Sequence, residues 1–398
     1  MDSVYISWEE LLGCNDWEGL LDPLDQSLRK LILKCGDFSQ AAHDAFDNDP
    51  YSKYCGFCRY GKKSFLEKVS VENASDFEVV SYLYGSAKVS ARETYFVRSK
   101  CREAWDRESN WIGFIASTSD EASRSLGRRE IYVAWRGTRR SYEWIDEMGA
   151  KLESIQPLLC NEQAQQRCDV PKVMRGWVSI YMTDDPKSSL AKLSAREQLL
   201  TKIHQLREKY RDEKLSIIFC GHSLGASLSI LSAFDVVENG IRDIPVAAIA
   251  LGSPRVGNEA FRRRCILYPN LKILRVTNKI DIVPHYPSRL LGYVNIGTEL
   301  RIDTRKSPHL KPSKNPSDWH NLQGMMHVVA GWTGEKGEFK LKVNRSVALV
   351  NKHSNFLRDE CHIPGSWWIL ENKGMARRED GEWALRVPEL EDQPIPES

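Results

Sequence analysis

The sequence has no excess of charge of either sign and no long apolar run. Its 56 Lys and Arg residues nearly balance its 54 Asp and Glu residues, which gives a formal net charge of +2. That balance provides no electrostatic basis for binding nucleic acid. The longest apolar stretches, such as Val246–Leu251, have the length of a buried strand and fall far short of the roughly 20 residues of a spanning helix. We therefore expect neither a nucleic-acid partner nor a transmembrane segment.

The chain also lacks the features of an exported or lipid-anchored protein. Its first ten residues are acidic and contain no basic segment followed by an apolar one, so no secretory signal or transit peptide is expected. No myristoylation or prenylation motif is present. The ten cysteines are scattered, and Cys55 and Cys58 form one CxxC without the second pair that a zinc site needs. We expect a cytoplasmic protein with reduced thiols, and the sequence leaves its oligomeric state open.

A regular alternation of strand and helix patterns begins at residue 111. Predicted strands cover residues 111–116, 131–136, 215–220, 246–251 and 272–277. Predicted helices cover residues 141–152, the segment after the capping box at 194–197, and residues 226–237. This alternation is typical of an α/β fold with a mostly parallel central sheet flanked by helices.

The two ends of the chain differ in character from this core. Residues 1–110 are expected to form a helical N-terminal elaboration packed on the core, with short helices at 8–21 and 26–33. The core itself would span residues 111–376, with irregular polar connections at 117–129 and 153–173. Residues 377–398 are polar and contain prolines, so we expect a frayed C-terminal tail.

The clearest functional signal is Gly221-His222-Ser223-Leu224-Gly225, which matches the G-x-S-x-G nucleophile elbow. It lies between a predicted strand and a predicted helix, which is the context that the motif requires. A nucleophile on so tight a turn has a strained backbone, and the glycines on either side remove collisions. The N-terminus of the following helix favours negative charge that develops at the site. We therefore predict that Ser223 is a nucleophile.

A serine hydroxyl needs a base, which is usually a histidine held by a carboxylate. In this fold the acid and then the base follow the serine along the chain. Asp281 is the favoured acid because it follows the predicted strand 272–277, and sites in open α/β sheets lie beyond the carboxyl ends of strands. Asp243 is too close to the elbow helix, and Asp303 is the main alternative.

The histidines downstream of the serine are His285, His309, His320, His327, His353 and His362. His285 is too close to Asp281 to lie on a separate loop, and His309 lies in a stretch rich in proline and lysine. His320 begins an apolar helical stretch, and His327 lies one or two turns inside it. Position alone favours His320 and leaves His327 as an alternative.

The segment Trp135-Arg136-Gly137-Thr138 ends a predicted strand upstream of the nucleophile. A second backbone donor for an oxyanion is expected at this place in the fold. Leu224, directly after the nucleophile, supplies the first backbone donor, and the Thr138 hydroxyl would add another. Taken alone, these residues predict an ester hydrolase that acts on an apolar acyl substrate.

A wider resemblance rests on segments spread over roughly residues 8–378. They are Trp17–Leu24, Tyr51–Tyr54, Ala134–Thr138 with Glu143 and Trp144, Gly221–Ala226, Gly252–Asn258, Ala348–Lys352, Trp367 with Trp368, and Asn372–Met375. These segments resemble the class 3 lipases and, within them, the plant phospholipase A1 enzymes of the class II, cytosolic type.

The resemblance implies an α/β-hydrolase fold and a catalytic triad of Ser223, Asp281 and His320. It also implies that Thr138 and the Leu224 amide hold the oxyanion, and that the reaction uses no metal or cofactor. His320 is preferred because it aligns with the first histidine of the family's H-D-L-E-x-Y-L-H stretch. Departures from this stretch at positions 321 and 323–326 leave the base in place and alter the helix behind it.

The activity that the resemblance implies is hydrolysis of the sn-1 acyl ester of phospholipids at a membrane or micelle surface. It also implies a lid within residues 141–175. A galactolipid or triacylglycerol lipase on the same site is one alternative, because loops that the sequence does not fold build the head-group pocket. A catalytically inactive, lipase-like scaffold protein is another, and the complete set of site residues argues against it.

Overall fold

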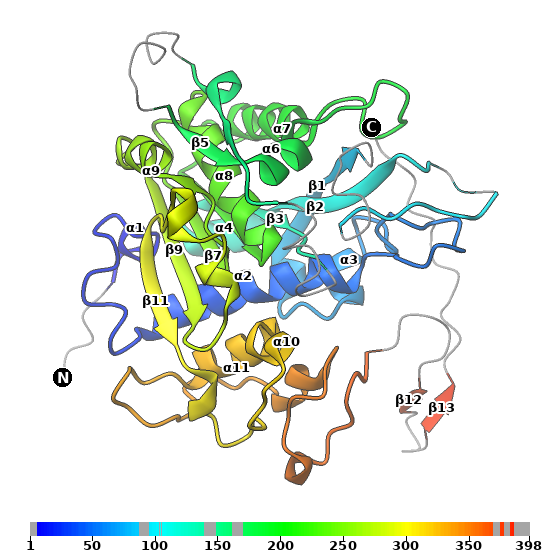
Figure 1. Cartoon of the computed structure of the whole chain (residues 1–398), viewed down its shortest axis with the longest axis vertical. Coiled ribbons are helices and arrows are strands. Elements are labelled where there is room, and N and C mark those ends of the chain that lie inside the picture. The colour runs from blue at the N-terminus through cyan, green and yellow to red at the C-terminus, as the bar shows by residue number, and fades with distance from the viewer. Residues whose placement is uncertain are drawn as a thin grey trace.

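The computed structural model describes residues 6–86, 95–102, 104, 106–138, 149–160, 170–368, 375–377 and 383–385 (Figure 1). A seven-stranded sheet of order β1-β2-β3-β6-β7-β9-β11 forms its centre. The strands are β1 (Phe77–Ser86), β2 (Ser109–Thr118), β3 (Arg129–Trp135), β6 (Leu215–His222), β7 (Val246–Leu251), β9 (Leu271–Asn278) and β11 (Thr298–Ile302).

The sheet is parallel from β3 to β11, and only β1 and β2 run antiparallel to their neighbours. Strands β3, β6 and β7 are buried along their whole length, which fits the apolar runs at residues 131–135, 217–220 and 246–251 within them. The predicted α/β fold with a mostly parallel central sheet is therefore confirmed. Because parallel strands end at the same edge, the loops after β6, β7 and β9 meet there.

Helices cover both faces of the sheet (Figure 1). One face carries α6 (Arg175–Met182), α7 (Ala195–Lys209) and α8 (Leu224–Glu238), and the other carries α2 (Gln26–Asp44) and α11 (Leu322–Gly331). Side chains of β6 alternate between the two cores. Ile217 and Phe219 lie in the core under α8, and Ile218 and Cys220 lie in the core under α2. The strand that leads to Ser223 is thus held from both faces.

Shorter elements surround this framework. The helices are α1 (Trp8–Leu11), α3 (Phe65–Lys68), α4 (Asp120–Leu126), α9 (Glu259–Ile266) and α10 (Pro316–Trp319). A small second sheet has the order β10 (Tyr293–Val294), β8 (Gly257–Asn258), β5 (Lys172–Met174) and β4 (Leu152–Ser154). A separate hairpin joins β12 (Met375–Arg377) and β13 (Trp383–Leu385).

Several local predictions differ from the structure. The helix expected at 8–21 ends at Leu11, and the helix expected at 26–33 continues to Asp44. The N-terminal 110 residues also supply β1, so they do not only add helices. The connection at 117–129 contains α4, and the irregular segment 153–173 contributes to β4 and β5. The division of the chain at residues 110 and 376 stays a prediction.

Two predictions fall partly outside the described residues. These are the helix at 141–152 and the lid within 141–175, of which residues 141–148 and 161–169 are not described. Most of the C-terminal tail is also outside them. No helix in the described part of the chain is long and apolar enough to cross a membrane.

The CxxC cysteines are buried and are free thiols. Burial raises the pKa of the Cys55 thiol to about 12, and the nearby charges of Asp47 and Asp49 act in the same direction. Burial likewise raises the pKa of Cys58 to about 12. Both thiols are protonated at neutral pH, so neither has the thiolate character of a redox or metal-binding cysteine.

Candidate active site

Ser223 lies on the turn between β6 and α8. Its backbone has φ 59° and ψ −124°, a strained conformation for a residue that carries a Cβ. Its N–H donates to the carbonyl of Leu251 at the end of β7, at 3.0 Å. The side chain is only 2% exposed, and its hydroxyl forms no hydrogen bond with any described residue. The turn thus presents an uncommitted hydroxyl at the carboxyl edge of the sheet.

The two glycines of the elbow allow a close approach of backbones. A Cβ on Gly221 would lie 2.3 Å from the carbonyl carbon of Gly225, and a Cβ on Gly225 would lie 2.4 Å from the carbonyl oxygen of Trp135 on β3. The first turn of α8 therefore packs directly on the sheet backbone. The first N–H groups of a helix have no acceptor within the helix, and the Leu224 amide is one of them.

Asp281 and His320 form a buried pair beside this turn. Nδ1 of His320 lies 2.6 Å from Oδ2 of Asp281. The other carboxylate oxygen of Asp281 accepts the N–H of Val283 at 2.9 Å. Asp281 lies in the loop after β9, and His320 caps the C-terminus of α10. The two side chains therefore come from separate loops that meet at the carboxyl edge.

The other acidic candidates lie in different surroundings. Asp243 is exposed and pairs with Arg207 at 2.8 Å, near the amino ends of the strands. Asp303 pairs with Arg305 at 2.7 Å. Both carboxylates are thus occupied by arginines, whereas Asp281 accepts from a histidine.

The other histidine candidates also have distinct partners. Nε2 of His327 lies 2.9 Å from the hydroxyl of Ser307, and the ring is buried. His309 packs edge-on against His327, with ring centroids 5.3 Å apart. Nε2 of His353 lies 2.6 Å from Oδ1 of Asp44.

His285 lies on the surface next to the Asp281 loop, and His362 lies in a separate turn after residues 359–361. Asp281 pairs with none of them.

Thr138 is buried and lies just beyond β3. Arg136 anchors the segment that carries it, because its guanidinium donates to the carbonyls of Trp111 at 3.1 Å and Tyr95 at 2.8 Å. Gly137 passes close to the elbow, since a Cβ there would lie 2.6 Å from the carbonyl oxygen of His222. The strand-ending turn thus holds Thr138 against the turn that carries Ser223.

Sequence reasoning gave no role to His222 or Gly252, and both contact His320. The rings of His222 and His320 lie 4.4 Å apart at an angle of 33°. Burial lowers the pKa of His222 well below 6.5, and the neighbouring His320 and His43 act in the same direction. Gly252 has φ +58°, and a Cβ there would lie 3.0 Å from Cε1 of His320. Gly252 begins one of the segments that carry the family resemblance, which was the available signal.

A cavity of about 450 Å³ opens onto these residues. Thr138, Ser223 and His320 line it together, and Asp281 lies behind His320. The remaining wall comes from α2, from the turn between α10 and α11, and from residues 350–355. Most of these side chains are amides, hydroxyls and imidazoles, and they include Gln40, His43, His222, Asn315, Ser317, Asn321, Gln323, His353, Ser354 and Asn355.

A buried polar cluster supports this wall. Asp44 of α2 accepts hydrogen bonds from Lys352 and from His353. Burial raises the pKa of the Asp44 carboxyl, but the bond from His353 and the charge of Lys352 outweigh burial and hold the pKa below its usual range. The ammonium of Lys352 also lies 4.1 Å from the centre of the Trp368 ring. The cluster ties α2 to residues 350–355 and orients His353 toward the cavity.

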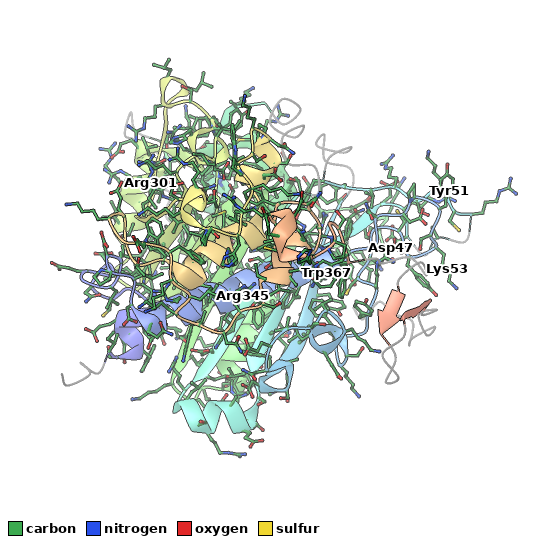
Figure 2. All side chains as sticks on the ribbon, turned by 90° about the horizontal axis from the view of Figure 1, so that it is seen from below. Asp47, Tyr51, Lys53, Arg301, Arg345 and Trp367 are labelled. Carbon is green, nitrogen blue, oxygen red and sulfur yellow. The ribbon has the colours of Figure 1, made fainter. Side chains whose placement is uncertain are left out.

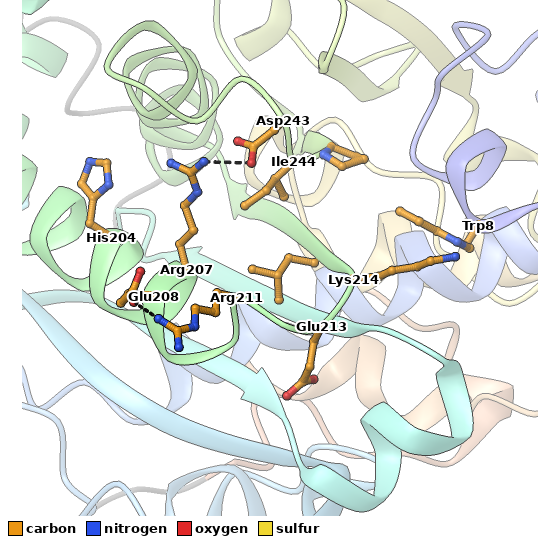
Figure 3. Close-up of a pocket in the computed structure, with 11 residues that line it drawn as sticks. Trp8, His204, Arg207, Glu208, Arg211, Glu213, Lys214, Asp243 and Ile244 are labelled. Atoms are coloured by element: carbon orange, nitrogen blue, oxygen red, sulfur yellow. Dashed lines mark hydrogen bonds and ion pairs between the residues drawn. The ribbon is translucent and has the colours of Figure 1, made fainter.

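A second cavity, of about 560 Å³, lies at the amino ends of the parallel strands, away from Ser223 (Figure 3). Its wall includes Leu215, which begins β6, and Pro245, which precedes β7. Four of its charged groups form two ion pairs, Arg207 with Asp243 and Arg211 with Glu208 at 2.9 Å. No serine or cysteine lines it. Despite its larger volume, it therefore offers no hydroxyl or thiol nucleophile.

The first cavity combines the parts that acyl transfer needs. It holds a hydroxyl on a strained turn, an imidazole oriented by a buried carboxylate, and donors from a helix N-terminus and a strand-ending turn. Such a set suits attack on an ester carbonyl, with charge accumulating on the carbonyl oxygen. Among the described residues, no group of His, Cys, Asp and Glu is arranged to hold a metal ion.

Comparisons with known proteins identify the family of the chain. The model of the family described as lipase (class 3) matches residues 132–291. The chain is 54% identical to the phospholipase A1-IIdelta of Arabidopsis thaliana, with all of both chains covered. It is 47% identical to the phospholipase A1-II 5 of Oryza sativa subsp. japonica, covering 98% of this chain and 84% of that protein. A solved lipase structure from Yarrowia lipolytica aligns over 73% of this chain and 83% of its own, with 20% identity and a TM-score of 0.48.

Proposed function

The chain belongs to the class 3 lipases, in their plant phospholipase A1-II group, and we propose that it hydrolyses the sn-1 acyl ester of phospholipids. The products are a lysophospholipid and a free fatty acid. The observation that carries the proposal is the buried Asp281–His320 pair, which shares one cavity wall with Ser223 on its strained turn. The names of the relatives direct the choice of phospholipid as the substrate.

In the proposed reaction, His320 takes the proton of Ser223 as the hydroxyl attacks the acyl carbonyl. Asp281 holds the ring so that Nδ1 carries a proton and Nε2 is the base, and it stabilises the imidazolium that forms. The Leu224 amide and Thr138 hydrogen-bond the oxyanion. The lysophospholipid oxygen then takes the proton from His320 and leaves. Water activated by His320 finally releases the fatty acid from Ser223.

The polar cavity wall supports a lipid with a hydrated head group. Gln40, Asn355 and His353 present amide and imidazole groups to the cavity on the side of α2 and residues 350–355. A triacylglycerol would cover this wall with a third acyl chain, and taking polar groups out of water without new hydrogen bonds costs binding energy. A galactolipid would also use such a wall, so it remains the second candidate substrate.

The cellular setting is part of the proposal. The cysteines in the described part of the chain are free thiols, which supports a reducing compartment such as the cytoplasm. The enzyme would then reach its substrate from the aqueous side of a membrane or micelle.

The test uses phosphatidylcholine that carries different labels at the sn-1 and sn-2 positions. We expect release of the sn-1 label by the wild type and none by Ser223→Ala, with both proteins showing the same thermal unfolding midpoint. Release of the sn-2 label first would contradict the positional assignment. Release from a monogalactolipid but not from phosphatidylcholine would make the galactolipid the substrate. No release by either folded protein would favour an inactive scaffold.

A further inference from the structure

A cavity of about 470 Å³ lies beside β9 and β11 and has a strongly basic wall. Arg255, Arg289 and Arg301 line it, and Glu299 is the one carboxylate among its lining residues. The reaction proposed above uses none of these groups. Figure 2 shows Arg301 on the opposite side of the molecule from Tyr51 and Lys53.

The register of the edge strands explains how the charges gather. Glu299 and Arg301 of β11 pair with Arg275 and Thr277 of β9, so the four side chains point to one face of the sheet. Glu299 accepts the Thr277 hydroxyl at 2.8 Å and lies 3.5 Å from the Arg275 guanidinium. The Glu299 carboxylate is therefore shared between Thr277 and Arg275, and this single negative charge does not balance the arginines around it.

Two of the arginines are buried and fixed in place. Arg255 is 7% exposed, donates to Asn295 at 3.1 Å and to the carbonyl of Pro287 at 2.7 Å. Arg275 is 5% exposed, and its Nε has no hydrogen-bond partner in the described structure. Burial lowers the pKa of both guanidinium groups, and Arg289 acts on both in the same direction. Buried cations that face one another gain stability when an anion binds between them.

The other two arginines reach solvent without a counter-charge. Arg289 and Arg301 are exposed, and neither forms an ion pair with any residue that the structure describes. A planar guanidinium binds phosphate oxygens through two parallel hydrogen bonds. The cavity therefore combines fixed and adjustable donors of the kind that phosphate recognition uses.

An apolar rim continues from this cavity. Leu290 is 97% exposed, Leu291 is 53% exposed and Ile282 is 47% exposed. Ile282, Arg255 and Arg289 also line a neighbouring hollow of about 520 Å³. Large aliphatic side chains exposed to this degree, next to unpaired arginines, are typical of a surface that enters a lipid interface. A dissolved anion would gain nothing from such a rim.

The rim and the active site share one loop. Ile282 directly follows Asp281, and Thr277 and Asn278 of the cavity wall end β9. The basic cavity therefore lies at the carboxyl edge of the sheet, the edge that also carries Ser223. A lipid surface bound at the rim would lie along the edge where the acyl ester must enter.

We propose that Arg255, Arg289 and Arg301, which line the cavity, form a binding site for the phosphate group of an anionic phospholipid in a membrane, with the charge of buried Arg275 behind them and with Leu290, Leu291 and Ile282 inserted beside the site. This site is separate from the cavity that holds Ser223, and it docks the enzyme on the surface that contains its substrate. The inference rests on the proposed function only in placing that substrate in a lipid bilayer.

The experiment measures the partition of full-length Ser223→Ala protein onto vesicles, so that no lipid is hydrolysed. Vesicles of phosphatidylcholine alone are compared with vesicles that contain phosphatidylserine or phosphatidic acid. Arg289→Gln with Arg301→Gln should weaken binding to anionic vesicles roughly 20-fold, because each arginine near such a surface contributes about fivefold. Arg124→Gln with Arg211→Gln removes the same charge from exposed positions of α4 and of the turn after α7, and binding should stay within about twofold.

A second pair of variants tests the apolar rim. Leu290→Ser should weaken binding about tenfold, because burial of one leucine side chain contributes that much or more. Leu193→Ser alters a leucine that is 49% exposed elsewhere and should leave binding unchanged. All these positions are on the surface, and equal thermal unfolding midpoints will establish that each variant is folded.

Three results would overturn the inference. The first is equal vesicle binding by the arginine variant and its control. The second is binding that does not depend on the anionic lipid. The third is a thermal unfolding midpoint that inorganic phosphate raises only when Arg289 and Arg301 are present, together with vesicle binding that does not require these arginines. That result would make the cavity a site for a dissolved anion. If the wild type hydrolyses no phospholipid but its binding to anionic vesicles still depends on the arginines, the proposed function is refuted and this inference stands.

Discussion

Nδ1 of His320 lies 2.6 Å from Oδ2 of Asp281, and both side chains are buried. The carboxylate reaches this position from the loop after β9, 39 residues earlier in the chain. Because Asp281 also accepts the N–H of Val283, its second oxygen is fixed and the first is directed at the ring. The pair therefore sets which ring nitrogen of His320 faces the cavity.

Asp281→Asn should lower kcat about 10⁴-fold with little change in folding. The amide keeps the shape of the carboxylate, but its N–H groups favour the wrong tautomer of His320 and give no charge to stabilise the imidazolium. The measurement is the steady-state hydrolysis of a short-chain, soluble ester. Asp303→Asn, at the alternative acid, should retain most of the activity because Asp303 only pairs with Arg305. Comparable losses in the two variants would contradict the assignment.

His320→Gln and His327→Gln should affect different properties. His320 lines the cavity with Ser223, so its loss should lower kcat by about 10⁴-fold or more, as expected for a general base. His327 is bonded to Ser307 in the core, so its replacement should lower the unfolding midpoint and leave kcat within about tenfold. Both quantities would be measured on the same preparations. An inactive but fully stable His327→Gln protein would reverse the choice between the two histidines.

Folding stability should decrease in mild acid because of His327. Burial lowers its pKa to about 4, and the charges of His309 and Arg345 act in the same direction. Between about pH 6.5 and pH 4 the unfolded chain then binds more protons than the folded one, so the free energy of unfolding falls as the pH falls through this window. The loss from this residue is about 3 kcal/mol. Urea unfolding at several pH values should show a flatter dependence in His327→Gln, and an unchanged slope would refute the prediction.

The inner parallel strands β3, β6, β7 and β9 could be predicted from sequence because they are buried on both faces and contain short apolar runs. The apolar run at residues 246–251 has the same bounds as β7. Strand β11 could not be predicted in this way because it lies at the sheet edge, and only its Leu300 and Ile302 are buried. β11 forms because it pairs with β9, and a pattern read from residues 298–302 alone does not include that partner strand.

The length of α2 shows how packing overrides a local signal. Gly36 suggests a turn, yet the helix passes through it to Asp44. A Cβ at Gly36 would lie 2.2 Å from the sulfur of Met326 on α11, so this glycine allows two helices to approach closely. Met326 is also one of the positions where the chain departs from the family pattern.

The same limit applies to the candidate site. Ser223 was predictable because its motif, strand and helix are contiguous. The choice between His320 and His327 needed the family resemblance, because the carboxylate that distinguishes them comes from another loop. The Asp44 cluster and the basic cavity depend wholly on contacts between distant segments, so no local pattern could have predicted either.

Thr138→Val should reduce kcat about 10²- to 10³-fold, the usual cost of one oxyanion donor. The substitution keeps the branched shape at a buried position and removes only the hydroxyl. KM should change little, because the donor acts on charge that develops during the reaction. Thr138→Ser restores a hydroxyl and should recover most of the activity. Equal activity of the Val and Ser variants would show that backbone donors alone hold the oxyanion.

Gly252→Ala should lower kcat about 100-fold through the position of His320. Gly252 has φ +58°, and a new Cβ would lie 3.0 Å from Cε1 of the His320 ring, so the ring must shift within its bond to Asp281. A misplacement of this size typically costs about two orders of magnitude in rate. Gly127→Ala is a matched control, because Gly127 has φ +66° and a Cβ at this position would meet no atom within 4 Å. Both variants should lose similar stability from backbone strain, and only Gly252→Ala should lose activity. If the two variants keep equal kcat, then His320 tolerates displacement and the Asp281 contact does not fix the base.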